Sequence, residues 1–111
     1  MRKLFKIAES IVDFHWQTNN MTVIEADGKK ITIALFKEQL YAFAYKCPHA
    51  GGVMAEGFID SLGNAVCPLH RYKFSLKNGR NPTGEDYLKT YPIEINDDGV
   101  FLVFEEKKTW F

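Results

Sequence analysis

The sequence predicts an all-β fold of the sandwich or barrel type. Apolar and polar residues alternate over several short runs, which is the period of a half-buried strand. Turn residues separate these runs at intervals of about 8–12 positions, as in sandwiches and barrels. No window long enough for a helix sustains a 3.6-residue repeat. The length of 111 residues corresponds to one domain, which we expect to span positions 1–111.

The predicted elements follow one another with clear turn signals. Ser10 is a candidate cap for a single helical turn over 10–14. Asp27-Gly28 predicts a hairpin, because glycine tolerates the positive φ that such turns require. Further turns are expected at Asn78-Gly79 and at 96–99, and the tail at 105–111 is expected to be a frayed end or a strap across the sheet. Strands are expected at 22–25, 30–36, 40–45, 57–60, 65–67, 72–76, 91–95 and 100–104.

Composition and charge exclude several classes of protein. With 46% apolar and 25% charged residues, the chain can bury a core and does not resemble a disordered segment. Fourteen basic and fourteen acidic residues cancel, which argues against a nucleic-acid binder. No apolar stretch approaches the roughly 18–20 residues of a membrane span, and the opening segment breaks before a signal-peptide core could form. We therefore expect a cytoplasmic protein.

Two short clusters contain both cysteines and two of the three histidines. They are Cys47-Pro48-His49 and Cys67-Pro68-Leu69-His70, so that each supplies one thiol and one imidazole. A disulfide between the two thiols would leave the neighbouring histidines unexplained. A structural zinc finger usually pairs Cys with Cys and His with His within a cluster. The mixed spacing instead suits a binuclear centre in which one iron takes both sulfurs and the other takes both imidazoles.

The sequence here resembles Rieske-type [2Fe–2S] ferredoxins and Rieske domains. The segments 47–52 and 67–70 are similar to the two cluster-binding loops of that family, and Phe74 and Gly79 stand at familiar spacings. Pro82 resembles the third loop, which covers the cluster. The segments 88–95 and 98–103 are similar to the closing hairpin. The resemblance extends over about 22–104, allows a further strand at the N-terminus, and implies a smaller cluster-binding lobe at about 46–82.

The resemblance also implies a function. Cys47 and Cys67 would hold the inner iron of one [2Fe–2S] cluster per chain, and His49 and His70 the outer iron at the exposed end. The cluster would take single electrons from a reductase, flavin-dependent or of another class, and pass them to a terminal acceptor such as a Rieske-type oxygenase. Such a carrier has no substrate of its own and is not an enzyme. It would belong to a multicomponent oxidoreductase system.

Some positions depart from the family pattern. Respiratory Rieske proteins have a second cysteine pair, where this chain has Gly51 or Gly52 and Leu69. Tyr72 and Phe74 stand where those proteins place a serine and a tyrosine hydroxyl. Fewer hydrogen bonds to the sulfurs predict a reduction potential toward the low end of the Rieske range of about −150 to +300 mV. Arg71 stands where ferredoxins of this family most often have glycine.

Other functions remain open at this point. The small Rieske subunit of a nitrite reductase, a redox-sensing module and a structural zinc domain are the alternatives. Oxygenase activity within this chain is excluded, because mononuclear iron needs two further histidines and only His15 remains. His15 itself is expected to be a surface or packing residue.

Basic residues dominate the segment that contains and follows the second cluster. Between 61 and 84 the chain has four basic residues and no Asp or Glu, and these four are Arg71, Lys73, Lys77 and Arg80. The simpler interpretation is the solvated face of a strand and hairpin. The alternative is a basic rim beside the cluster that attracts an acidic partner.

Overall fold

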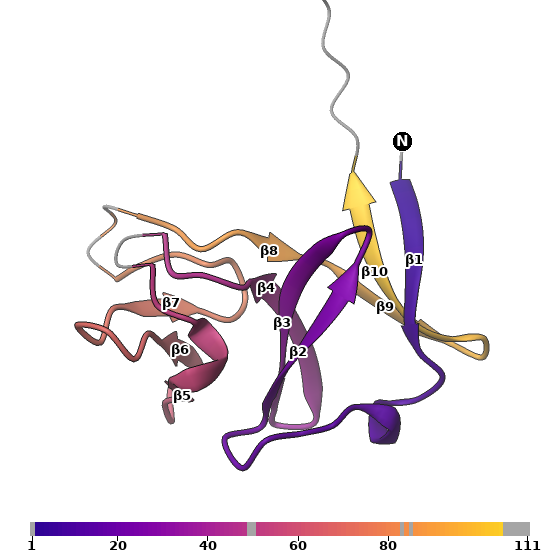
Figure 1. The fold of residues 1–111 in the computed structure, drawn as a ribbon, viewed down its shortest axis with the longest axis horizontal. Helices are drawn as coiled ribbons and strands as arrows, with labels where there is room; N and C mark the ends of the chain where they lie inside the picture. The colour runs from indigo at the N-terminus through magenta and orange to yellow at the C-terminus, as the bar shows by residue number, and fades with distance from the viewer. Residues whose placement is uncertain (1, 49–50, 83, 85, 106–111) are drawn as a thin grey trace, which may run out of the picture.

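Three antiparallel sheets make up the fold (Figure 1). The computed structural model describes residues 2–48, 51–82, 84 and 86–105. The terminal sheet has the order β1-β10-β9, the central sheet β2-β3-β4-β8 and the lobe sheet β5-β6-β7. Their bounds are β1 Arg2–Ala8, β2 Met21–Ala26, β3 Lys29–Phe36, β4 Gln39–Ala44, β5 Phe58–Ile59, β6 Asn64–Val66, β7 Lys73–Ser75, β8 Thr90–Tyr91, β9 Ile93–Asn96 and β10 Gly99–Glu105, with short 3-10 turns η1 Ile11–Asp13 and η2 Met54–Glu56.

The central sheet is buried on both faces. On β3, Ile31 and Ile33 pack into the core shared with the terminal sheet, whereas Ala34 packs into the core shared with the lobe. The neighbouring strand β4 divides in the same way, with Ala42 on the terminal side and Phe43 on the lobe side. The lobe therefore rests on a two-sided sheet, and both predicted cysteine ligands belong to the core on its side.

Most predicted elements are confirmed, with bounds shifted by one or two residues. Asp27 and Gly28 have φ of +53° and +76° and join β2 to β3. Ser10 caps η1: its hydroxyl oxygen accepts a hydrogen bond from the Val12 N–H, and Asp13 bonds back to the Ser10 N–H. The further strand that the resemblance allowed at the N-terminus is β1, which pairs with β10 from the other end of the chain. The segment 106–111 of the predicted tail lies outside the described residues.

The expected strand at 91–95 is wrong as a single element, because Pro92 divides it. Proline has no N–H to donate to a ladder. Tyr91 before it pairs with β4 of the central sheet, and Ile93 after it pairs with β10 of the terminal sheet. The Pro92 carbonyl still accepts a hydrogen bond from the Val103 N–H at 2.9 Å. The chain thus passes from one sheet to the next at this residue.

The structure also refines the expected core and surface. Of the aromatic residues on strand patterns, Phe43 is fully buried, whereas Phe36, Tyr45 and Phe101 are half-buried. His15 is exposed, as predicted. Among the residues described, no helix has the length and apolar character needed to cross a membrane.

Candidate metal centre

The two predicted ligand loops close in the same way. The Cys47 N–H donates to the Gly52 carbonyl at 2.8 Å, and the Cys67 N–H donates to the Tyr72 carbonyl at 2.8 Å. Each cysteine therefore begins a loop that is tied back to the main chain five residues later. In the first loop an isolated bridge between Lys46 and Val53 extends this closure.

The thiols of Cys47 and Cys67 meet in the interior of the lobe. Both are free cysteines, 2% and 0% exposed, and both belong to the same buried cluster, where Cys47 lies close enough to Cys67 to affect its pKa. Burial raises the pKa of the Cys67 thiol, although the N–H groups of Leu69 and Gly52 donate to its sulfur and act in the opposite direction, and the neighbouring Cys47 raises it further. Binding a metal would replace these protons, since the thiolate is the ligand form.

The imidazole of His70 is placed differently from the thiols. His70 is exposed and has a left-handed backbone with φ of +62°, and its ring meets the Tyr72 ring edge-on at 6.3 Å between centroids. His49, the fourth predicted ligand, lies outside the described residues. Within the part of the chain that is described, no three Cys, His, Asp or Glu side chains form a group that could hold one ion. The described donors thus separate into an inner pair of thiols and an outer imidazole.

Glycine at position 52 keeps space beside the inner thiols. A Cβ on Gly52 would lie 3.0 Å from the Cys67 sulfur and 3.1 Å from Cγ of Leu69. Its N–H can therefore reach the sulfur without a side chain intervening. Gly57, which follows η2, is more constrained, because a Cβ there would lie 1.9 Å from the Val66 carbonyl oxygen. Close backbone packing at these two glycines holds the first loop against β6 and the second loop.

A third loop, between β7 and β8, packs against the lobe sheet. Gly79 enters it with φ of +75°, and the Leu88 N–H donates to the Gly79 carbonyl at 2.7 Å. The buried Asn81 donates through Nδ2 to the Lys73 carbonyl at 3.1 Å, which ties the loop to β7. Pro82, predicted to belong to a covering loop, is exposed and follows Asn81 directly.

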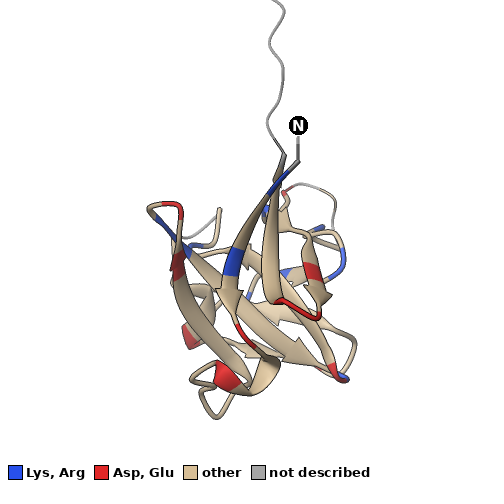
Figure 2. Cartoon of the chain, turned by 90° about the vertical axis from the view of Figure 1, so that its right-hand side faces the viewer, with Lys and Arg blue, Asp and Glu red and all other residues tan. Residues whose placement is uncertain are grey.

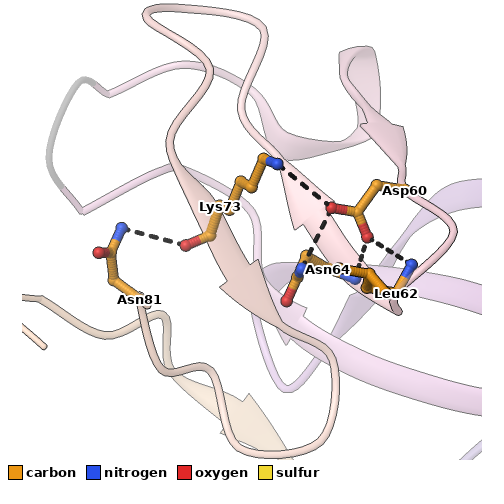
Figure 3. A network of polar contacts seen from close by, with 5 residues as sticks. All are labelled: Asp60, Leu62, Asn64, Lys73 and Asn81. Carbon is orange, nitrogen blue, oxygen red and sulfur yellow. Dashed lines mark hydrogen bonds and ion pairs between the residues drawn. The ribbon is translucent and has the colours of Figure 1, made fainter. Parts of the chain in front are cut away.

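Asp60 organises the side of the lobe sheet (Figure 3). Its Oδ1 accepts from the N–H groups of Leu62 at 3.0 Å and Asn64 at 2.9 Å. Its Oδ2 accepts from Asn64 Nδ2 at 3.1 Å and lies 3.7 Å from Lys73 Nζ. Partial burial acts to raise the pKa of Asp60, but the Asn64 and Leu62 hydrogen bonds and the Lys73 charge together hold it below 3.8. The sequence reasoning did not single out Asp60, although an acid preceding a Ser-Leu-Gly turn was a visible signal.

Replacing Asp60 by asparagine is expected to weaken the lobe in a pH-dependent manner. A carboxyl whose pKa is lower in the folded state stabilises that state above its ordinary pKa, and this contribution disappears as pH falls through the folded value. In urea unfolding, the free energy of unfolding of the wild type should exceed that of the variant by a constant amount of about 1–2 kcal/mol between pH 7 and 5. Below pH 3.8 the advantage should shrink. An advantage independent of pH down to about 2 would contradict this assignment.

The donors present fit a binuclear iron–sulfur cluster. Thiolates are soft ligands suited to iron–sulfur centres, and mixed Cys and His ligation characterises one class of them. The paired buried thiols of Cys47 and Cys67 and the exposed imidazole of His70 match a cluster with an inner and an outer iron. N–H groups of Gly52 and Leu69 already directed at the Cys67 sulfur would stabilise its negative charge.

Comparison with known proteins decides the family. The Rieske [2Fe–2S] domain model matches residues 10–92, which is most of the chain. This chain belongs to the Rieske [2Fe–2S] domain family. The 3-phenylpropionate/cinnamic acid dioxygenase ferredoxin subunit of Escherichia coli (strain K12) is 33% identical to this Rieske chain over 78 residues, or 67% of the chain and 74% of that subunit. The cofactor of this Rieske chain is accordingly a [2Fe–2S] cluster.

Solved structures share the fold of this Rieske chain. A chain of the complex of reduced oxygenase and oxidized ferredoxin in carbazole 1,9a-dioxygenase superposes with a TM-score of 0.74 at 19% identity, covering 96% of this chain and 97% of that one. A Mycobacterium tuberculosis protein described as an NADH-dependent nitrite reductase small subunit gives a TM-score of 0.79 at 16% identity, covering 96% and 99%. These similarities confirm the all-β Rieske-like fold with its smaller lobe.

Proposed function

We propose that this chain is a ferredoxin-type carrier of single electrons in the cytoplasm. It takes electrons from a reductase, of the flavin-dependent or another class, and delivers them to a terminal oxygenase or a comparable acceptor. One observation carries the proposal: two buried thiols meet inside the lobe while the His70 imidazole of the same loop is exposed to solvent. The similarity to a dioxygenase ferredoxin subunit supports the same role.

Each part of the proposed site has a distinct task. Cys47 and Cys67 would hold the inner iron, and His49 and His70 the outer iron, of a cluster that accepts and releases one electron. Burial of the thiols keeps water away from the inner side, while exposed His70 offers a short route to a docked partner. The N–H groups of Gly52 and Leu69 would stabilise the added negative charge at the Cys67 sulfur. The lobe at about 46–82 would be the electron-transferring part of a single domain at 1–111.

Purification under anaerobic conditions and reduction by dithionite test the proposal. We expect a red-brown protein with about two irons and two sulfides per chain and a reduced EPR spectrum of low average g. Reduction should take one electron, and the reduced protein should then transfer it to a Rieske-type oxygenase but show no turnover of an organic substrate by itself. A colourless preparation with one zinc per chain would overturn the proposal in favour of a structural zinc domain.

The acceptor assay also distinguishes the remaining alternatives. Electron delivery to the catalytic subunit of a nitrite reductase, with none to an oxygenase, would assign the chain to nitrite reduction instead. A reversibly reducible cluster that serves neither acceptor would favour a redox-sensing module. Both results would retain the cluster and overturn the proposed carrier role.

A further inference from the structure

Acidic and basic residues occur at both ends of the longest dimension of the molecule. The lobe region 45–82 has five basic and two acidic residues, and the loop that follows adds Glu85 and Asp86. The segment 90–105 has four acidic and no basic residues, but β1, which pairs with β10, adds Arg2, Lys3 and Lys6. Figure 1 places the lobe and the β9–β10 hairpin at opposite ends of the 43 Å axis. Figure 2 looks onto the hairpin end, where acidic positions lie on strands and turns and basic positions lie on β1. Because the net charge is zero and both signs occur at each end, orientation in the field of a partner would depend on local charges.

Two cations flank the ligand loops directly. Lys46 precedes Cys47, Arg71 follows His70, and both side chains are exposed. The acidic residues of the lobe are Glu56, which lies in η2, and Asp60, which is hydrogen-bonded within its own turn and lies near Lys73. In the chain, Arg71 is thus the cation next to the exposed imidazole of His70, and Lys46 is the cation at the start of the first ligand loop.

The backbone of Arg71 has an unusual conformation for a residue with a side chain. Arg71 has φ of +56°, in the left-handed region, directly after His70 at +62°. Glycine adopts this conformation without the steric cost that a side chain incurs. An arginine at such a position reduces stability unless its guanidinium contributes elsewhere. Strained backbone of this kind often occurs where function requires a particular side chain.

We propose that Lys46 and Arg71 form a basic rim around the electron-exit end and dock an acidic face of the protein redox partner. The inference rests on the proposed carrier function and specifies the chemistry of its partner. Complementary charge would increase the encounter rate and orient His70 toward the acceptor. High ionic strength would weaken this attraction, since the two cations are exposed.

Two small oxidants of opposite charge test the rim in the holoprotein. In stopped-flow experiments the reduced protein gives one electron to one of the two oxidants. Ferricyanide is reduced to ferrocyanide, and tris(phenanthroline)cobalt(III) is reduced to the cobalt(II) complex. At low ionic strength, Arg71→Gly and Lys46→Gln should each slow the ferricyanide reaction about fivefold and accelerate the cobalt reaction. Salt should slow the ferricyanide reaction of the wild type and have less effect on the variants. Poly-L-glutamate should slow the wild type more than Arg71→Gly.

Two matched variants distinguish a loss of docking from a loss of stability and from a change in net charge. Arg71→Gly relieves the left-handed strain, so this variant should unfold at a higher urea concentration although its ferricyanide reaction is slower. Lys3→Glu on β1, beyond the central sheet from the lobe, changes the net charge more but should alter the rate by less than about 1.5-fold. Equal rates in wild type and Arg71→Gly, or an equal loss in Lys3→Glu, would overturn the rim. A protein that reacts with neither oxidant would overturn the carrier function instead.

Discussion

Cys67→Ala is expected to abolish cluster binding. Cys67 is fully buried and lies in the same buried cluster as Cys47. Replacing Cys67 by alanine removes one of the two proposed sulfur ligands. Because the position is buried, a water molecule cannot take the place of the sulfur. Iron content should fall at least tenfold, and the visible absorption should disappear. Iron and sulfide analysis together with the visible spectrum of the purified variant measure this effect.

Two further variants define the specificity of that result. Cys47→Ala should lose the cluster to the same extent, because the proposed inner iron needs both thiolates. His15→Ala should retain full iron, since His15 is exposed and lies in the segment between η1 and β2, outside the two ligand loops. Far-UV circular dichroism should show that the strand content of Cys67→Ala persists. Normal iron and sulfide in Cys67→Ala would contradict the ligand assignment.

Gly79→Ala is expected to cause a large loss of stability. Gly79 has φ of +75°, and an added Cβ would lie 1.8 Å from the Leu88 carbonyl oxygen. Because that oxygen belongs to the main chain, relief requires moving the third loop away from β7 or β8. The free energy of unfolding should fall by about 3 kcal/mol or more, which is in the range of severe single substitutions. Urea unfolding followed by tryptophan fluorescence measures the change.

Gly84→Ala is the matched control for this prediction. Gly84 lies in the same loop with φ of +78°, but its added Cβ would meet nothing within 4 Å. The substitution therefore tests the left-handed backbone alone, at a cost of about 1–2 kcal/mol. A loss in Gly79→Ala no larger than that in Gly84→Ala would show that the close approach to Leu88 is not a constraint.

The candidate site illustrates what spacing reveals and what it leaves open. The two mixed clusters identified Cys47, His49, Cys67 and His70 as candidates, because scarce metal-binding residues recurred in the same order. Spacing did not show that the two thiols would be buried in one cluster while His70 is exposed. That division depends on the packing of both loops against β6 and the central sheet. Asp60 was missed, since its role depends on hydrogen bonds within its own turn and on Lys73 and not on the two clusters.

The β class, the hairpin at Asp27-Gly28 and the capped turn at Ser10 were all predictable from the residues alone. These features depend on the period of burial and on the conformational preferences of a few adjacent residues, and both are local properties. Tertiary structure decided the pairing of β1 with β10, the two-sided burial of β3 and the change of sheet at Pro92. Each of these depends on contacts between segments far apart in the chain. The packing of the whole domain, and not the local sequence pattern, selects which segments pair.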